Sequence, residues 1–204
     1  MSTVPDLSTI PAGFDDPVLN SQSTFRLVLD ALSRPGRISK LDVQAAPEGF
    51  NFATAGLALC LFDFNTPIFL SPLLRTEQVE SWIRFHCSAP ITTIPAEADF
   101  AVLAKGDSWP NLMDFNRGSE KYPDVSTSLI LQVQSLDQGR TVTISGPGNK
   151  APVDLQIEGL PEHFWAARAD AVSDFQLGLD CFFTAENAVL GLPRSNQHTL
   201  KAGA

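Results

Sequence analysis

The sequence predicts an α/β protein built as a three-layer mixed sheet with helices on both faces. Two observations lead to this prediction. Helical and strand-like segments alternate through the first half of the 204-residue chain, and strands separated by short turns dominate the second half. Alternating helices and strands are typical of sheets covered on both faces, whereas strands joined by short turns are antiparallel. No internal repeat or linker interrupts the pattern, so one domain is expected.

The first half of the chain carries most of the expected helices. Residues 1–17 contain several prolines and no hydrophobic period, which indicates an irregular arm. A helix then begins near Ser21 or Ser23, either of which can cap it, and ends at Pro35-Gly36. The segments expected next are a strand at 38–43, a buried helix at 53–62, a strand at 67–70, a helix capped by Thr76 and a strand at 100–104.

The second half is expected to be mainly antiparallel. The expected segments are a short helix from 107 or 108 to 116, a hairpin of 128–136 with 140–145, a third strand at 153–157, a helix at 161–172 and a hairpin of 179–183 with 188–192. The first hairpin is expected to turn at the glycine-containing segment Asp137-Gln138-Gly139. Residues 199–204 are expected to be a frayed tail, so the domain should span 18–198.

Composition and charge exclude several classes of protein. The chain has 14 basic and 23 acidic residues and a net charge of -9, which disfavours binding to nucleic acid or anionic lipid. No apolar run approaches the ~20 residues that span a bilayer. The first twenty residues lack a basic start followed by an apolar stretch, so we expect no secretory signal. Cys60, Cys87 and Cys181 lie far apart in apolar stretches. They are expected to be buried, reduced thiols of a cytoplasmic protein.

The usual catalytic sequence patterns are absent. The chain has no dinucleotide-binding glycine pattern, P-loop or nucleophile turn. Its three histidines, His86, His163 and His198, lack the spacing of metal ligands. No lysine is well placed to hold pyridoxal phosphate, although Lys105 follows a predicted strand. We therefore expect no catalytic residue, no metal and no cofactor.

Four polar residues at or near the predicted helices are candidates for ligand binding: Arg26, Asp63, Arg84 and His86. Arginines together with His86 could hold a phosphate or phosphonate, because a guanidinium directs two donors onto one oxyanion. Structural roles are the alternatives. Asp63 could hold a turn through bonds to Asn65 or Thr66, His86 could cap its helix, and Arg26 could belong to an ion pair.

Several short pieces of the sequence resemble the PhnH family, the H subunits of the bacterial carbon–phosphorus lyase system. The pieces are Thr24-Phe25-Arg26, Ser33-Arg34-Pro35-Gly36, Asp63-Phe64-Asn65-Thr66-Pro67, Arg84-Phe85-His86, Leu129-Ile130-Leu131-Gln132-Val133, Gly178-Leu179-Asp180 and Pro193-Arg194. Each is weak alone, but their order and spacing from about 15 to 198 are specific. Two positions depart from the family: Cys87 stands where threonine is frequent, and Gln176 where proline is usual.

The resemblance implies a fold similar to that of the pyridoxal phosphate-dependent transferases, without the cofactor. It also implies a protein that dimerises alone and joins the G, I and J subunits in the lyase core complex. With the L subunit, that system (alpha-D-ribose 1-methylphosphonate 5-triphosphate synthase) attaches an alkylphosphonate to the ribose of ATP with loss of adenine. The J subunit cleaves the carbon–phosphorus bond later. No catalytic residue is carried over from the family.

The expected function is therefore that of a subunit that acts in phosphonate catabolism through assembly. Two alternatives remain open at this point. One is a stand-alone phosphonate- or nucleotide-binding enzyme that uses the four candidate residues, and the other is a purely structural homodimeric scaffold.

Overall fold

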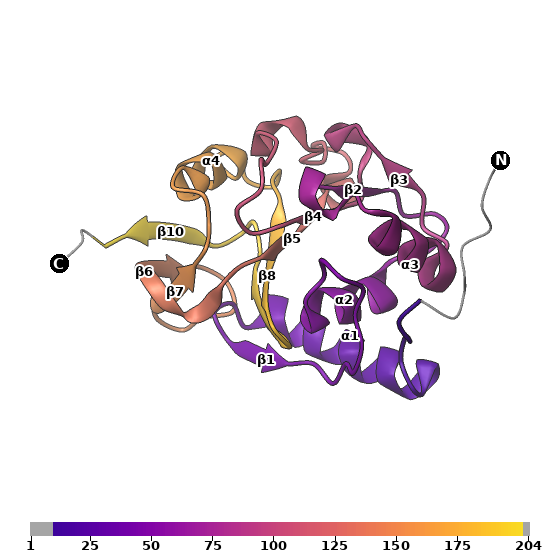
Figure 1. Ribbon diagram of the computed structural model, residues 1–204. Coiled ribbons are helices and arrows are strands. Elements are labelled where there is room, and N and C mark those ends of the chain that lie inside the picture. Colours follow the sequence, from indigo (N-terminus) through magenta and orange to yellow (C-terminus); the bar gives the residue numbers. More distant parts are fainter. Residues whose placement is uncertain (1–9, 202–204) are drawn as a thin grey trace.

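The computed structural model describes residues 10–201, which form two sheets and four α-helices (Figure 1). The helices are α1 (Pro17–Ser33), α2 (Phe52–Leu61), α3 (Glu77–Cys87) and α4 (Phe164–Ala171). The strands are β1 (Ile38–Lys40), β2 (Ile68–Leu70), β3 (Ile91–Thr92), β4 (Phe100–Leu103), β5 (Ser128–Gln132), β6 (Ser135–Ser145), β7 (Val153–Glu158), β8 (Asp180–Ala185), β9 (Ala188–Leu192) and β10 (Gln197–Leu200).

The larger sheet has seven strands in the order β1-β9-β8-β5-β4-β2-β3. β9 is antiparallel to both of its neighbours, and all the other neighbouring pairs are parallel. Six strands therefore run in one direction and β9 runs against them. β10, β6 and β7 form a separate antiparallel sheet.

Side chains of the central strands alternate between two apolar cores, one on each face of the larger sheet. Ile130 of β5 and Phe182 of β8 lie in the core that contains the buried residues of α1, α2 and α3. Leu131 and Phe183, the next residues along, lie in the core shared with α4 and the smaller sheet. The mixed α/β prediction with helices on both faces is thus confirmed, and the smaller sheet shares the second face with α4 (Figure 1).

The helix α1 begins earlier than the sequence analysis predicted. Its N-cap is Asp16, whose carboxylate accepts hydrogen bonds from the backbone N–H groups of Val18 and Leu19 at 3.1 and 3.0 Å. Pro17 occupies the first turn, where its missing N–H costs nothing. The Ser21 or Ser23 caps were therefore wrong. The helix includes Pro17, which was expected to be the last residue of the irregular arm. Residues 1–9 of that arm lie outside the described residues.

The predicted hairpin between 128–136 and 140–145 does not exist. β5 lies in the middle of the larger sheet between β4 and β8, whereas β6 runs unbroken from Ser135 through Asp137 to Ser145 in the smaller sheet. β5 is apolar on both faces, as a buried parallel strand requires. Gly139, with a φ of 99°, lies where the register between β6 and β7 shifts. The glycine that indicated a turn therefore forms an irregularity inside one strand.

Other boundaries were predicted with mixed success. The helix with its Thr76 cap, the buried helix α2, α4 and the β8–β9 hairpin are confirmed. The expected helix at 107–116 is only a single 3₁₀ turn at Leu112–Asp114, and the short strand β3 was not predicted. The frayed tail was wrong for Thr199 and Leu200, which pair with β6 in β10, and residues 202–204 lie outside the described residues.

Gly191 allows α1 to approach β9 closely, and this contact gives a testable prediction. A Cβ added at Gly191 would lie 2.5 Å from the backbone oxygen of Ala31. We expect Gly191→Ala to lower the free energy of unfolding by about 2 kcal/mol, because the helix must move away from the sheet. Urea unfolding measures the loss. Lys40→Ala, a change at an exposed residue of the neighbouring strand β1, is the control and should cost less than about 0.5 kcal/mol, and equal losses in the two variants would contradict the prediction.

Candidate functional site

Polar side chains of the protein bond to one another at the carboxyl ends of β5 and β8, which are part of the edge where α/β proteins usually bind ligands. Asn51 donates from Nδ2 to the backbone oxygen of Thr184 at 3.1 Å and to its hydroxyl at 3.2 Å. The hydroxyls of Thr54 and Thr184 lie 2.9 Å apart. Gln132 accepts from the backbone N–H of Asn51 at 2.7 Å and donates to the backbone oxygen of Gly49 at 2.8 Å. These polar side chains join strands β5 and β8 to the start of α2.

Asp63 has a structural role in the turn after α2. Its carboxylate accepts from the backbone N–H of Asn65 at 2.8 Å, and the Thr66 hydroxyl bonds to both backbone groups of Asp63. This is the Asx-type turn that the sequence analysis kept as the alternative. Arg26, by contrast, is exposed on α1, and no ion pair or hydrogen bond of its side chain is found among residues 10–201.

Arg84 and His86 lie in the last turn of α3 and both have partners. Arg84 pairs with Glu80, one turn earlier, at 3.0 Å. The Nε2 atom of His86 lies 2.9 Å from the backbone oxygen of Pro11, and its ring packs on Trp82. Trp82 also donates to the same oxygen, at 3.1 Å. His86 thus holds the segment that precedes α1 against α3. No hydrogen bond or ion pair within residues 10–201 joins any two of the four candidate residues.

A buried arginine that the sequence analysis missed organises the end of the chain. Arg168 of α4 is 1% exposed and donates to the backbone oxygens of Asn196, at 3.1 Å, and Pro193, at 2.9 Å. It also lies 3.1 Å from Nδ1 of His198. No carboxylate among the described residues forms a salt bridge with it, and burial lowers its pKa. Nothing in the sequence around Arg168, which lies in the largely apolar helix α4, indicates that its side chain is buried or bonded to these backbone oxygens.

His198 completes this cluster as a neutral side chain. Because Arg168 can only donate, Nδ1 accepts, and Nε2 therefore carries the proton that is donated to the backbone oxygen of Trp165 at 2.9 Å. Burial and then the charge of Arg168 lower the pKa of His198. The cluster joins β10 to α4, and within it Nε of Arg168 and Nδ2 of Asn196 are buried without a hydrogen-bond partner among the described residues.

A second arginine joins two pieces of the sequence that were singled out above. Arg194 forms a salt bridge with Asp180 and donates to the backbone oxygen of Pro123 at 2.7 Å and to the Ser126 hydroxyl. The backbone N–H of Arg194 also donates to Asp180, at 2.7 Å. These bonds join the loop before β5 to the strands β8 and β9, so both pieces have structural roles.

The three cysteines are suited to packing and not to catalysis. Burial raises the pKa of Cys60 to about 11, that of Cys87 to about 12 and that of Cys181 to about 11. Their thiols therefore stay protonated at neutral pH. Among residues 10–201, no group of three His, Cys, Asp or Glu side chains could hold a metal ion. The same residues contain no helix long and apolar enough to cross a membrane.

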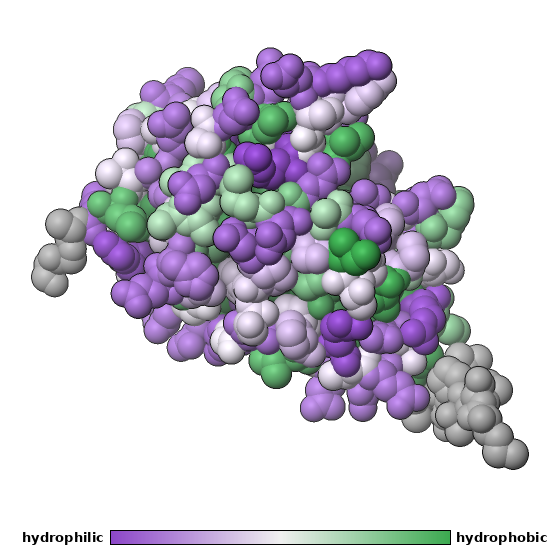
Figure 2. Space-filling view, turned by 90° about the horizontal axis from the view of Figure 1, so that it is seen from above, coloured by the Kyte–Doolittle hydropathy of each residue, from purple (hydrophilic) through white to green (hydrophobic). Residues whose placement is uncertain are grey.

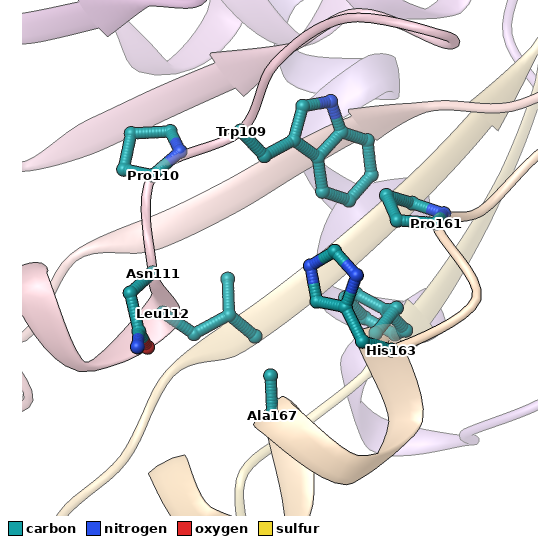
Figure 3. Close-up of a pocket in the computed structure, with 8 residues that line it drawn as sticks. Trp109, Pro110, Asn111, Leu112, Pro161, His163 and Ala167 are labelled. Carbon is teal, nitrogen blue, oxygen red and sulfur yellow. The ribbon is translucent and has the colours of Figure 1, made fainter.

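One pocket of about 280 Å³ lies between α4 and the loop after β4 (Figure 3). Trp109, Pro161 and His163 line one side of it, and Asn111 lies on the other. Its lining contains no lysine or arginine, so it is poorly suited to a phosphate or phosphonate. Trp109 already donates to the backbone oxygen of Ala104, and Asn111 already accepts from a backbone N–H, which leaves few polar groups to recognise a ligand.

Apolar side chains are exposed at several places on the surface. On the face shown in Figure 2, hydrophobic residues occur in small groups separated by hydrophilic ones. An ordered set lies on α1, where Val18, Phe25 and Leu29 are 77%, 46% and 51% exposed.

The fold and the polar clusters define a class: a mixed α/β protein in which polar side chains join the protein's own elements to one another. Comparison with known proteins specifies the family. The chain belongs to the PhnH family, described as "Bacterial phosphonate metabolism protein (PhnH)", whose profile matches residues 12–199.

Two relatives extend over most of the chain. The alpha-D-ribose 1-methylphosphonate 5-triphosphate synthase subunit PhnH of Rhizobium meliloti (strain 1021) is 39% identical over 188 residues, which cover 90% of this chain and 92% of the relative. A protein of Stutzerimonas stutzeri named as a C-P lyase subunit, HtxG, is 26% identical over 184 residues, 88% of this chain and 86% of the relative. The family predicted from the short sequence pieces is thus confirmed.

The buried Arg168 gives a prediction about stability. We expect Arg168→Met to lower the free energy of unfolding by about 3 kcal/mol, because the backbone oxygens of Pro193 and Asn196 lose a charged donor. Urea unfolding measures the difference. Arg140→Met, a matched change at an exposed arginine, should cost less than about 0.5 kcal/mol. Similar losses in both variants would show that the buried bonds contribute little.

His198 gives a prediction about pH. The unfolded chain protonates this residue near 6.5, whereas the folded protein keeps it neutral to lower pH because its pKa is lowered. The contribution of His198 to the free energy of unfolding is therefore fully present above pH 6.5. It is lost as the pH falls towards the pKa of the folded state, by no more than about 1.4 kcal/mol per pH unit. Denaturation of the protein and of His198→Gln at several pH values tests this. The free energy of unfolding should fall less steeply with falling pH in the variant than in the unchanged protein. Identical pH dependences would refute the assignment of a lowered pKa to His198.

Proposed function

We propose that this protein is the H subunit of an alpha-D-ribose 1-methylphosphonate 5-triphosphate synthase and serves in organic phosphonate catabolism. In that role it is required for coupling an alkylphosphonate to the ribose of ATP with loss of adenine. The observation that carries the proposal is the match to the PhnH family across residues 12–199. The Rhizobium meliloti relative, which bears the name of this subunit, aligns with 90% of the chain.

The internal contacts favour a role within an assembly over independent catalysis. The carboxyl edge of the sheet is occupied by Asn51, Gln132 and Thr184, which bond to one another or to the backbone. The pocket beside His163 has no cationic side chain for a phosphate. A protein of this kind contributes surfaces to a larger active complex, and we propose the G, I and J subunits as its partners.

Several finer features belong to the same proposal. We propose that the protein works in the cytoplasm, that residues 18–198 form one domain, and that its fold is similar to that of the pyridoxal phosphate-dependent transferases. The mixed sheet covered on both faces supports the last point. Lys105 is exposed beside Gln134, at 3.4 Å, and is not enclosed as a Schiff-base lysine would be.

Of the four candidate ligand residues, Arg26 keeps the strongest case for a contact with phosphonate, nucleotide or a partner. Arg84, His86 and Asp63 all have protein partners, and a ligand would have to displace them. Arg26 is exposed, and no such partner is found among the described residues.

Reconstitution tests the proposed function. With the G, I, J and L subunits, ATP and methylphosphonate, addition of this protein should restore adenine release, and the protein should copurify with G, I and J. Alone, it should release no adenine. Arg140→Met, an exposed change, should behave as the unchanged protein does. Adenine release at full rate without this protein, together with failure to copurify, would refute the proposal.

A further inference from the structure

The pocket between α4 and the loop after β4 lies where α/β proteins commonly bind small molecules. β4 runs parallel to both of its neighbours, β2 and β5, and the loop that follows its carboxyl end lines the pocket. Trp109 of this loop is joined to the strand end, because its indole Nε1 donates to the backbone oxygen of Ala104 at 2.7 Å. Ligands of open α/β sheets bind just outside the carboxyl ends of the strands. The pocket therefore has the position of a ligand site.

The size of the pocket limits what it can hold. Its volume of about 280 Å³ is near the lower end of the range of about 300–1,000 Å³ that is usual for ligand pockets. In Figure 3, Trp109, Pro161 and His163 lie on one side of the hollow and Asn111 lies on the other. The hollow therefore has room for one small ring system and not for a whole nucleotide.

The walls of the pocket suit a flat and uncharged ring. Trp109 and His163 supply aromatic surfaces on which a heterocycle can stack, and such stacking is favourable without any charge. The indole of Trp109 is held in place by its hydrogen bond and by the ring of Phe164, which meets it at 90° with the centroids 6.0 Å apart. Among the described residues that line the pocket there is no lysine, arginine, aspartate or glutamate. The fitting ligand is therefore neutral.

The polar groups that remain in the pocket select the kind of ring. Oδ1 of Asn111 accepts from the backbone N–H of Met113 at 3.0 Å, which fixes the orientation of the amide, and Nδ2 has no partner among residues 10–201. The ring nitrogens of His163 have none there either. Oδ1 keeps a second lone pair, so the amide can both accept and donate. A carboxamide of this kind pairs with the N6–H donor and the N7 acceptor of adenine.

We propose that this pocket binds the free base adenine, with its ring against the aromatic side and its N6–N7 edge at Asn111. The choice of adenine rests on the proposed function, in which the coupling step releases this base from ATP. The free base fits better than the nucleotide, because the pocket lining offers no cation to a triphosphate and the whole chain has a net charge of -9.

Titration calorimetry of the isolated full chain tests the ligand. Adenine should bind with a dissociation constant of about 1 mM or tighter. Hypoxanthine has the same shape but an oxygen acceptor in place of the 6-amino group, and it should bind about fivefold more weakly or worse. ATP should also bind more weakly than adenine. The absence of saturable binding of adenine, equal affinity for hypoxanthine, or an affinity for ATP as high as that for adenine would overturn the proposal.

A matched pair of variants tests the location. Asn111→Asp keeps an acceptor for the Met113 N–H but replaces the donor Nδ2 by an oxygen, so the dissociation constant for adenine should rise about tenfold. Asn65→Asp makes the same change at an exposed position in the turn after α2 and should leave the constant unchanged. An unchanged affinity in Asn111→Asp, or an equal loss in both variants, would overturn the proposal.

A third variant tests the stacking. Trp109→Leu removes the indole surface and should also weaken adenine binding about tenfold. Circular dichroism shows whether this variant is folded. If it is not, the comparison of Asn111→Asp with Asn65→Asp decides. Full affinity for adenine in a folded Trp109→Leu protein would overturn the proposed site.

These outcomes are distinguishable from failure of the proposed function. If adenine does not bind, but adenine release with the G, I, J and L subunits still depends on this protein, the pocket assignment is overturned and the proposed function stands. If adenine binds and Asn111→Asp weakens it, but coupling proceeds at full rate without this protein, the proposed function is refuted and the base-binding pocket stands.

Discussion

Burial of the seven-stranded sheet on both faces is the constraint on which the rest of the structure depends. Ile130 and Leu131 are both 0% exposed, although they point in opposite directions from β5. Neither layer of covering elements is therefore dispensable. α1, α2 and α3 cover one face, and α4 with the smaller sheet covers the other (Figure 1).

The buried polar residues serve this layered arrangement. Arg168 bonds to the backbone oxygens of Pro193 and Asn196. Arg194 bonds to that of Pro123 and Asn51 to that of Thr184, and each of these partners is distant in sequence. Most of these polar atoms are satisfied by the protein itself, whereas Nε of Arg168 and Nδ2 of Asn196 are buried and have no hydrogen-bond partner among the described residues. The polar contacts of the protein thus lie mainly between its own elements, whereas α1 exposes apolar side chains on its outer side.

Elements with a strong local signal could be predicted from the sequence. The apolar helix α2 and the Thr76 cap of α3 follow from residue type and spacing alone, and the family followed from the order of short pieces. Partners distant in sequence could not be predicted. β5 has the apolar composition of a central strand, but its hydrophobic residues fit a hairpin equally well, and only the positions of β4 and β8 decide between them.

The candidate site was predicted less well for a related reason. Asp63 showed its turn-forming role through its neighbours Asn65 and Thr66, which are close in sequence. His86 bonds to Pro11, and Arg168 bonds to Pro193 and Asn196, and nothing in the local sequence of either residue indicates these contacts. Long-range hydrogen bonds to backbone oxygens leave no residue-type pattern, because every residue carries the acceptor.

The pairing of β1 with β9 has a consequence for biosynthesis. The first strand of the sheet, Ile38–Lys40, can take its place only after residues 188–190 have left the ribosome, because those residues are its hydrogen-bonding partners. All the residues between β1 and β9 must therefore be translated before the sheet can close. Contacts of such large sequence separation slow folding, and the apolar strands stay exposed to other nascent chains meanwhile. Prompt pairing of β1 with β9 after both have been synthesised is thus a condition for assembly of the native sheet.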